Sequence, residues 1–158
     1  MLDLGAAPGG WSLFARRLLG DSGEVVAVDA RHVEPIPGVE YVAGKVGEPR
    51  LAERLQGRTF EVVLSDMSPR ISGAYATDHA RSVALVQEAA NLCRKVLGEG
   101  GTFVAKVFAG DLLDSLVREL DEQFGRVVRT KPPASRAHSS EVYLLCFHHR
   151  AQRPASSP

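Results

Sequence analysis

Short runs of apolar, often β-branched residues alternate along this chain with segments of helical periodicity. We expect strands over residues 2–5, 24–29, 39–43, 60–66, 102–108, 126–130 and 141–147. We expect helices over residues 11–19, 49–57, 78–97 and 112–124. Continuously apolar strands that alternate with helices are typical of a sheet covered on both faces. The pattern therefore predicts an α/β fold with a mostly parallel, seven-stranded sheet and helices on both faces.

The length and composition suit one globular domain. The chain has 158 residues, of which 44% are hydrophobic, which is enough for a sizeable core. We expect the domain to span residues 1–150 and the tail, residues 151–158, to be disordered. The longest helix is expected to stop before Gly98 and the Gly100–Gly101 pair, since glycines commonly follow a helix.

Charge, cysteine content and hydropathy exclude several classes of protein. The 19 basic residues balance the 19 acidic ones, so the net charge argues neither for nor against nucleic acid. Cys93 and Cys146 lack metal-site spacing and are interpreted as reduced core thiols, so we expect no metal. No apolar run approaches the roughly 20 residues of a membrane span, and no signal peptide is evident. We expect a cytoplasmic protein, with His148 and His149 as a solvated pair.

A glycine-rich turn, GAAPGG, separates the first expected strand from the first expected helix. Gly5 and Gly9 allow a sharp turn and a close approach of a ligand, and the helix that follows offers free N–H groups. The spacing fits neither G-x-G-x-x-G nor G-x-x-x-x-G-K-[ST], so a dinucleotide or a nucleoside triphosphate is not favoured. The alternative is a plain strand–helix connection.

Asp29 ends the second expected strand, 20 residues after Gly9. A carboxylate at this place can accept hydrogen bonds from two ribose hydroxyls, because ligands of such sheets lie beyond the carboxyl ends of the strands. The alternative is an ordinary cap at the end of a strand. Together, the turn and Asp29 predict a cofactor that contains a nucleoside.

Lys106 is one of only four lysines and lies inside the strand-like run TFVAKVF. Lysine is rarely buried unless it is paired, and two acids could pair with it: Asp66 ends one expected strand and Glu141 begins another. Burial lowers the pKa of an amine whereas nearby carboxylates raise it, so such a lysine can be tuned to act as a base. The alternative is a lysine that reaches solvent from an ordinary strand.

Several motifs occur in order between residue 2 and about residue 147. They are DLGAAPGGWS (3–12), SDMSP (65–69), SG (72–73), DH (78–79), AKVFAGD (105–111) and KPPASRAHSSEVYLL (131–145). In these motifs the chain resembles the FtsJ/RrmJ family of S-adenosylmethionine-dependent 2′-O-ribose methyltransferases, which act on RNA. The resemblance implies a single Rossmann-like methyltransferase domain and S-adenosylmethionine as the cofactor.

The resemblance also implies roles for individual residues. Lys106 would be the proton acceptor, and Asp66 and Glu141 would orient it and stabilise its charge. The implied cofactor-binding residues are Gly5, Gly9, Trp11, Asp29, Lys45 and Asp66. Without the resemblance, Trp11 would be interpreted as a core aromatic residue on the first turn of a helix.

The sequence departs from the family pattern in two places. The family carries a further catalytic lysine on a helix before the first strand, whereas this sequence begins inside that strand, so we expect a domain that is short at its N-terminus. This leaves open a non-catalytic RNA- or cofactor-binding module. Lys45 stands where the family has an aspartate that contacts adenine. An ammonium cannot accept a hydrogen bond from the adenine amino group, so we expect weaker cofactor binding.

The family suggests a uridine of large-subunit (23S) ribosomal RNA as the substrate, with transfer RNA as the alternative. We expect a monomer whose partner is RNA. The basic residues expected to contact the RNA phosphates lie beside the catalytic strand ends and are Arg70, Lys131 and Arg136. Aromatic residues are sparse at 6%, which disfavours a base-stacking platform. An NAD-dependent oxidoreductase is disfavoured by the glycine spacing and by the set of residues around Lys106.

Overall fold

A computed structural model describes residues 1–131 and 140–151 of the protein. The strands are β1 (Leu2–Leu4), β2 (Val25–Asp29), β3 (Val39–Ala43), β4 (Phe60–Ser65), β5 (Leu97–Phe108), β6 (Phe124–Thr130) and β7 (Glu141–His149). The helices are α1 (Gly10–Leu19), α2 (Pro49–Arg54), α3 (Tyr75–Val96) and α4 (Leu113–Gln123), with a short 3-10 helix η1 (Gly20–Ser22). Residues 152–158, most of the expected tail, lie outside the described residues.

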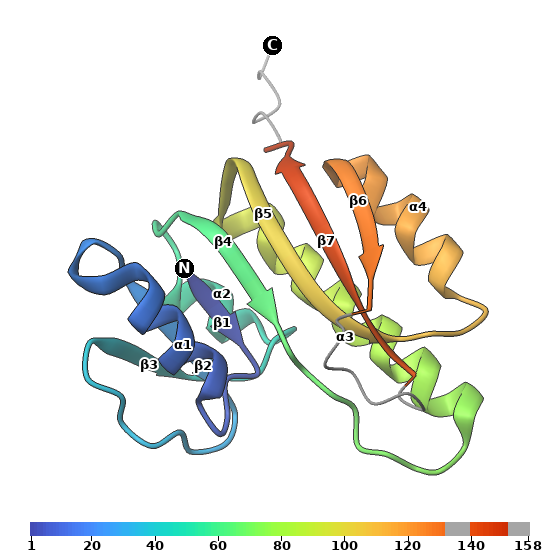
Figure 1. The fold of residues 1–158 in the computed structure, drawn as a ribbon, viewed down its shortest axis with the longest axis horizontal. Helices are drawn as coiled ribbons and strands as arrows, with labels where there is room; N and C mark the ends of the chain where they lie inside the picture. The colour runs from blue at the N-terminus through green and yellow to red at the C-terminus, as the bar shows by residue number, and fades with distance from the viewer. Residues whose placement is uncertain (132–139, 152–158) are drawn as a thin grey trace.

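The strands form one seven-stranded sheet in the order β3-β2-β1-β4-β5-β7-β6 (Figure 1). Strands β1 to β5 pair in parallel, whereas β7 runs antiparallel to both of its neighbours, β5 and β6. The α/β fold with seven strands was therefore predicted correctly, and the insertion of β7 makes the sheet mixed.

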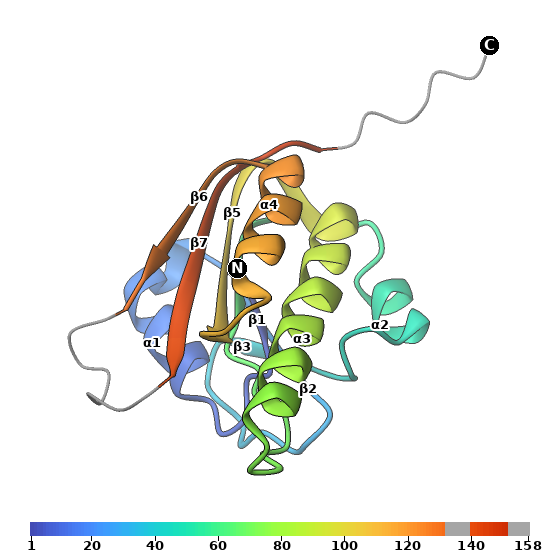
Figure 2. The same ribbon diagram turned by 90° about the vertical axis from the view of Figure 1, so that its right-hand side faces the viewer.

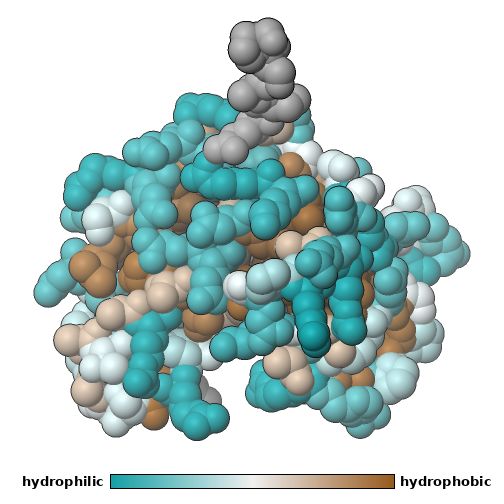
Figure 3. All heavy atoms as spheres, turned by 180° about the vertical axis from the view of Figure 1, so that it is seen from behind, coloured by the Kyte–Doolittle hydropathy of each residue, from teal (hydrophilic) through white to brown (hydrophobic). Residues whose placement is uncertain are grey.

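Helices cover the two faces of the sheet unequally. α1 lies on one face, and α2, α3 and α4 lie on the other (Figure 2). The larger core lies between the sheet and the three helices, and its fully buried side chains include Phe103, Phe124 and Leu116. The outer surface of these helices is largely hydrophilic, with apolar side chains between them (Figure 3). Burial of one helix stripe is what the amphipathic spacing predicts.

Half of the sheet face on the α1 side has no helix over it within the described residues. α1 packs against β2 and β3 (Figure 1). Beyond it, Leu64, Val104, Leu145 and Val128 lie in register across β4, β5, β7 and β6, and each is only partly buried. Lys106 lies two residues after Val104 on the same face of β5, and Asp66 lies two residues after Leu64, just past the end of β4.

α3 ends at Val96, so the long helix stops before Gly98 as expected, but the glycines that follow it belong to a strand. β5 begins at Leu97, directly after α3, and takes in Gly98, Gly100 and Gly101. Phe60 pairs with Leu97 but Val62 with Thr102, so the strand carries a register shift at this place, with Gly100 at φ 75°. Glycines inside a strand pattern mark such bulges as readily as they mark turns.

The prediction for the two histidines near the end is wrong for His149. Its side chain is 1% exposed, its Nδ1 lies 3.1 Å from the Gly98 carbonyl oxygen, and its ring packs on Phe124 with centroids 5.3 Å apart. His148 is exposed. His148 has φ 61°, which interrupts the alternation that places Leu144 and Cys146 in the core, so that His149 rather than His148 turns inward.

The two cysteines are free and buried, as the sequence predicts. Burial raises the pKa of the Cys93 thiol well above its usual value and that of Cys146 to about 12. Both thiols are therefore unreactive core groups. The helices of the described residues are too short or too polar to cross a membrane.

Candidate active site

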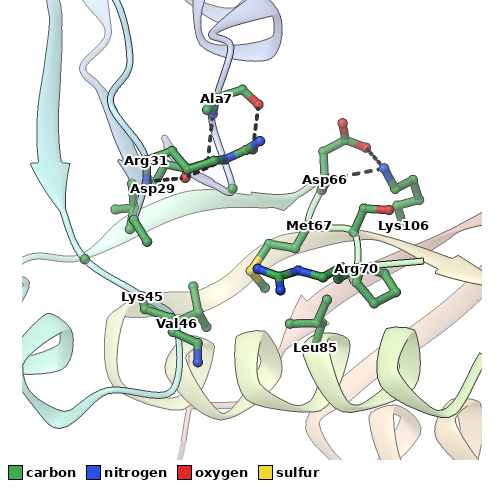
Figure 4. Close-up of a pocket in the computed structure, with 16 residues that line it drawn as sticks. Ala7, Asp29, Arg31, Lys45, Val46, Asp66, Met67, Arg70, Leu85 and Lys106 are labelled. Carbon is green, nitrogen blue, oxygen red and sulfur yellow. Dashed lines mark hydrogen bonds and ion pairs between the residues drawn. The ribbon is translucent and has the colours of Figure 1, made fainter. Parts of the chain in front are cut away.

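A pocket of about 650 Å³ opens where β1, β2, β4 and β5 end (Figure 4). The space-filling view is also hollowed at the lower edge of the molecule (Figure 3). The pocket volume of about 650 Å³ lies within the range of roughly 300–1,000 Å³ that is usual for small-molecule sites. The residues that line it include Gly5, Ala7, Val28, Asp29, Arg31, Lys45, Val46, Asp66, Met67, Arg70, Leu85 and Lys106.

Gly5 and Ala7 of the glycine turn line this pocket. Gly5 has φ 75° and Gly9 has φ 120°, a left-handed region that favours glycine. A Cβ atom at Gly5 would lie 2.6 Å from Cγ of Met67, so the turn is packed closely against the chain that leaves β4. The turn is thus fixed both by its backbone conformation and by this close contact.

Asp3 is a fully buried acid on β1, under the turn. Its Oδ2 accepts a hydrogen bond from the Ser12 hydroxyl at 2.5 Å, and its Oδ1 has no partner among the described residues. Burial is the main reason that the pKa of Asp3 is raised; the Ser12 hydrogen bond opposes this, and the charges of Asp66 and Asp29 add to it. Three carboxyl groups therefore lie near one another around the turn.

Asp29 ends β2 and is 7% exposed. Its carboxylate accepts hydrogen bonds from the backbone N–H of Ala7 at 3.0 Å and of Arg31 at 2.7 Å. Burial acts to raise the pKa of Asp29, but these hydrogen bonds and the Arg31 side chain hold it below its usual value. An ionised carboxylate thus faces the pocket, and its remaining lone pairs can accept from hydroxyl donors.

The structure brings Lys106, Asp66 and Glu141 together, and Lys106 and Asp66 line the pocket across from Asp29 (Figure 4). Lys106 Nζ lies 3.1 Å from Asp66 Oδ1, 3.2 Å from the Asp66 carbonyl oxygen and 3.6 Å from Glu141 Oε1. The lysine side chain is only 10% exposed. Asp66 follows β4, Lys106 lies near the end of β5, and Glu141 begins β7, so the sheet order itself creates this cluster.

Tyr143 is a member of this cluster that the sequence analysis did not identify. Its hydroxyl donates a hydrogen bond to Asp66 Oδ1 at 3.2 Å, and it is the cross-strand partner of Lys106. Burial, followed by the charge of Asp66, raises the pKa of Tyr143 to about 12, so it remains a donor. Its signal in the sequence is the spacing from Glu141, because residues two apart share one face of a strand.

The structure places two of the expected cofactor residues outside the pocket wall. Gly9 caps α1, and Trp11 lies on the first turn of that helix. The indole is 41% exposed, its centroid lies 6.3 Å from that of the Tyr143 ring, and it lines a small hollow with Asp66 and Val104. Trp11 is therefore a neighbour of the cluster around Lys106.

The basic candidates differ in position. Lys45 and Arg70 both line the pocket (Figure 4). Lys131 is exposed just after β6, and Arg136 lies outside the described residues. Within residues 1–131 and 140–151, His, Cys, Asp and Glu side chains form no group of three that could hold a metal.

Comparison with known proteins agrees with this arrangement. The model of the FtsJ-like methyltransferase family matches residues 1–149. The Ribosomal RNA large subunit methyltransferase E of Chromohalobacter salexigens is 45% identical over 154 residues, which cover 94% of this chain and 73% of the relative. This chain belongs to the FtsJ-like methyltransferase family. The family resemblance inferred from the motifs is thus confirmed, and the protein is a methyltransferase enzyme.

Solved structures of other methyltransferases share the fold of this FtsJ-like enzyme. A putative ribosomal RNA methyltransferase from Plasmodium falciparum superposes with a TM-score of 0.84 at 25% identity, over 96% of this chain and 86% of that one. Human Methyltransferase-like protein 13, solved in complex with SAH, gives a TM-score of 0.65 at 16% identity, over 98% and 74% of the two chains. At that identity, the human structure bears on the fold alone.

Proposed function

We propose that this FtsJ-like enzyme transfers a methyl group from S-adenosylmethionine to the 2′-hydroxyl of a ribose in large-subunit (23S) ribosomal RNA, most simply at a uridine. It would act as a monomer in the cytoplasm. The observation that carries the proposal is the contact of the Lys106 amine with Asp66 and Glu141, beside a pocket that also presents Asp29. The name of the relative from Chromohalobacter salexigens supports the choice of RNA.

The residues of the pocket fit S-adenosylmethionine. Asp29 would accept hydrogen bonds from the ribose hydroxyls of the cofactor, and Val46 and Leu85 offer apolar surface to a nucleobase. Asp66 adds a second carboxyl group to the pocket wall, which suits a ligand that carries a sulfonium and an ammonium. Lys45, also in the pocket wall, does not fit the adenine, because an ammonium cannot accept a hydrogen bond from the adenine amino group.

Positioning is the main task of the residues around the reaction. When bound, the cofactor supplies a methyl group on a sulfonium, whose positive charge disappears on transfer. Little new charge therefore needs stabilising, and holding the 2′-hydroxyl in line gains most of the rate. Lys106 is only 10% exposed and is held by Asp66, so its amine is well placed to hold that hydroxyl.

Lys106 would also take the proton of the 2′-hydroxyl as the new C–O bond forms. For this step the amine must be neutral, with its lone pair directed at the hydroxyl. Asp66 and Glu141 then stabilise the resulting ammonium, at 3.1 Å and 3.6 Å. Tyr143 donates to the same Asp66 oxygen and so fixes the carboxylate. Arginine could not replace Lys106, because a guanidinium stays protonated in proteins.

Transfer of a labelled methyl group tests the proposal. The enzyme would be incubated with S-[methyl-³H]adenosylmethionine and with whole ribosomes, free large subunits or transfer RNA. We expect label in the RNA of large subunits, recovered as a 2′-O-methylated nucleoside after nuclease digestion. Label in transfer RNA alone would show that transfer RNA, and not ribosomal RNA, is the substrate. Binding of S-adenosylhomocysteine without label in any RNA would support the non-catalytic alternative.

A further inference from the structure

The first turns of α3 contact the chain that leaves β5, next to the catalytic cluster. Tyr75, His79 and Ser82 follow one another at helical spacing, so they lie along one side of α3. Each of the three binds a backbone group of residues 108–112. The proposed chemistry does not use these side chains.

His79 uses both of its ring nitrogens to bind this segment. The residue is 4% exposed; its Nδ1 lies 3.0 Å from the Phe108 carbonyl oxygen, and its Nε2 lies 3.0 Å from the backbone N of Leu112. The backbone N–H of Leu112 can only donate, so Nε2 must be the unprotonated acceptor. Nδ1 therefore carries the proton and donates it to Phe108. The ring is neutral and held in one tautomer.

Two neighbours of His79 complete the attachment. Ser82 Oγ accepts a hydrogen bond from the Phe108 N–H at 3.1 Å and donates one to the His79 carbonyl at 2.8 Å. Tyr75 donates its hydroxyl proton to the Ala109 carbonyl at 2.7 Å, and its ring stacks on His79 with centroids 6.3 Å apart. Both backbone groups of Phe108 are thus bound by α3.

Gly110 shows how closely this segment runs over the imidazole. A Cβ atom at residue 110 would lie 2.6 Å from Cγ and Cδ2 of the His79 ring. Any larger residue would force the ring and the segment apart. The close contact therefore depends both on the His79 ring and on the absence of a side chain at Gly110.

The same segment is tied to the catalytic residues. Phe108 lies two residues after Lys106 in β5 and is the cross-strand partner of Glu141. The backbone N–H of Ala109 donates to the Ser140 carbonyl at 2.7 Å, one residue before Glu141. A shift of Phe108 would therefore move Lys106 and Glu141 together.

The residue before His79 binds the loop that follows β4. Asp78 accepts hydrogen bonds from the Ser72 N–H at 2.8 Å, the Ser72 hydroxyl at 2.7 Å and the Gly73 N–H at 3.1 Å. These hydrogen bonds hold the pKa of Asp78 below its usual value. Adjacent residues of α3 thus attach the loops that follow Asp66 and Lys106.

We infer that His79 is a positioning residue for methyl transfer, which holds residues 108–112 so that Lys106 and Glu141 keep their geometry. This inference rests on the proposed function. His79 contacts the backbone of Phe108 and Leu112 and acts on the reaction through them. Misplacing reacting groups by about 1 Å can lower a rate roughly 100-fold, so a side chain outside the reaction can control kcat.

Variants of His79 test the inference by removing its two hydrogen bonds separately. His79→Asn keeps a donor near Nδ1, His79→Gln keeps an acceptor near Nε2, and His79→Phe keeps a ring without either. His149→Phe is the matched control, because His149 is also buried but binds Gly98, at the opposite end of β5. Tyr75→Phe removes only the hydrogen bond to the Ala109 carbonyl, and it replaces His79→Phe as the test variant if His79→Phe does not fold.

We expect His79→Phe to lower kcat about 100-fold while the KM for S-adenosylmethionine stays unchanged. His79→Asn and His79→Gln should each recover part of kcat, and His149→Phe should keep the wild-type kcat. A kcat loss that is equal in His79→Phe and His149→Phe would reflect general destabilisation and would overturn the inference. Wild-type kcat in His79→Phe would overturn it as well.

A second readout does not depend on turnover. The chain has only four lysines, so ¹³Cε-lysine NMR can follow Lys106, whose resonance is assigned by its loss in Lys106→Arg. We expect its chemical shift to change in His79→Phe and to stay at the wild-type value in His149→Phe. An unchanged shift in His79→Phe would overturn the inference. If no variant or wild type methylates RNA, the proposed function fails, whereas this measurement still decides the role of His79.

Discussion

Asp66 Oδ1 accepts from two groups, the Lys106 amine at 3.1 Å and the Tyr143 hydroxyl at 3.2 Å. Two donors on one oxygen restrict the carboxylate to a narrow set of orientations, and the carboxylate in turn restricts the amine. The sequence indicated Lys106 and Asp66 because a lysine inside an apolar strand needs a partner. It could not indicate that a tyrosine from β7 would share the same oxygen.

Replacing Tyr143 with Phe tests this environment through the pH dependence of the free energy of unfolding. An unfolded tyrosine ionises near pH 10, at its usual pKa of about 10, whereas burial raises the pKa of Tyr143 to about 12. The stabilisation from the protonated hydroxyl is complete below the unfolded pKa and is lost as the pH rises toward the folded pKa. In urea unfolding, the wild type should lose stability more steeply than Tyr143→Phe across this alkaline range. Equal slopes would contradict the prediction.

Lys45→Asp tests the departure from the family pattern in the pocket wall. An aspartate can accept a hydrogen bond from the adenine amino group, and bonds to charged groups are worth about 1.5–3 kcal/mol. We expect S-adenosylhomocysteine to bind roughly tenfold more tightly, as measured by titration calorimetry. Lys95→Asp makes the same change of charge on α3, outside this pocket, and is the control. An affinity that does not change in Lys45→Asp would argue against the assignment.

At the scale of the elements, periodicity predicted each strand and each α-helix. Tertiary contacts determined where the elements begin and in which order the strands pair. α3 starts at Tyr75 rather than at residue 78, because its first turn is exposed and carries little apolar pattern. The place of β7 between β5 and β6 depends on pairing between segments that are distant along the chain. For the same reason, the contact of His79 with residues 108–112 could not be foreseen.

Two neighbouring valines of β4 test the unequal cover of the sheet. Val63 is 0% exposed in the core under α3, whereas Val62 is only partly buried and lies on the other face. Val63→Ala should lower the free energy of unfolding by about 2 kcal/mol, and Val62→Ala by less than about 1 kcal/mol. Chemical denaturation of both variants measures the difference. Equal losses would mean that both faces are packed alike.

At the scale of the whole molecule, the functional groups gather at one edge of the sheet. Asp29, Asp66 and Lys106 lie at or near the ends of different parallel strands, whereas the helices cover the two faces of the sheet (Figures 1 and 2). Ligands of open α/β sheets bind beyond the carboxyl ends of the strands. The sequence predicted this edge because polar residues follow apolar runs there.

Binding of the cofactor product should stabilise the whole domain. A ligand that binds only the folded state adds about 2.7 kcal/mol at 100 times its Kd, so S-adenosylhomocysteine should raise the Tm. NAD should not, because the glycine turn lacks the dinucleotide spacing. Trp11, the one tryptophan, reports the same event by fluorescence, since it adjoins Asp66. A Tm that rises with NAD and not with S-adenosylhomocysteine would contradict the prediction.

The most direct test of the account is the rate at which wild type and Lys106→Arg form a 2′-O-methylated nucleoside in large-subunit RNA. We predict that the wild type forms it and that Lys106→Arg is at least about 100-fold slower, with S-adenosylhomocysteine affinity unchanged, because a guanidinium cannot accept the proton. A rate near that of the wild type in Lys106→Arg, or a methyl group on the base, would contradict it.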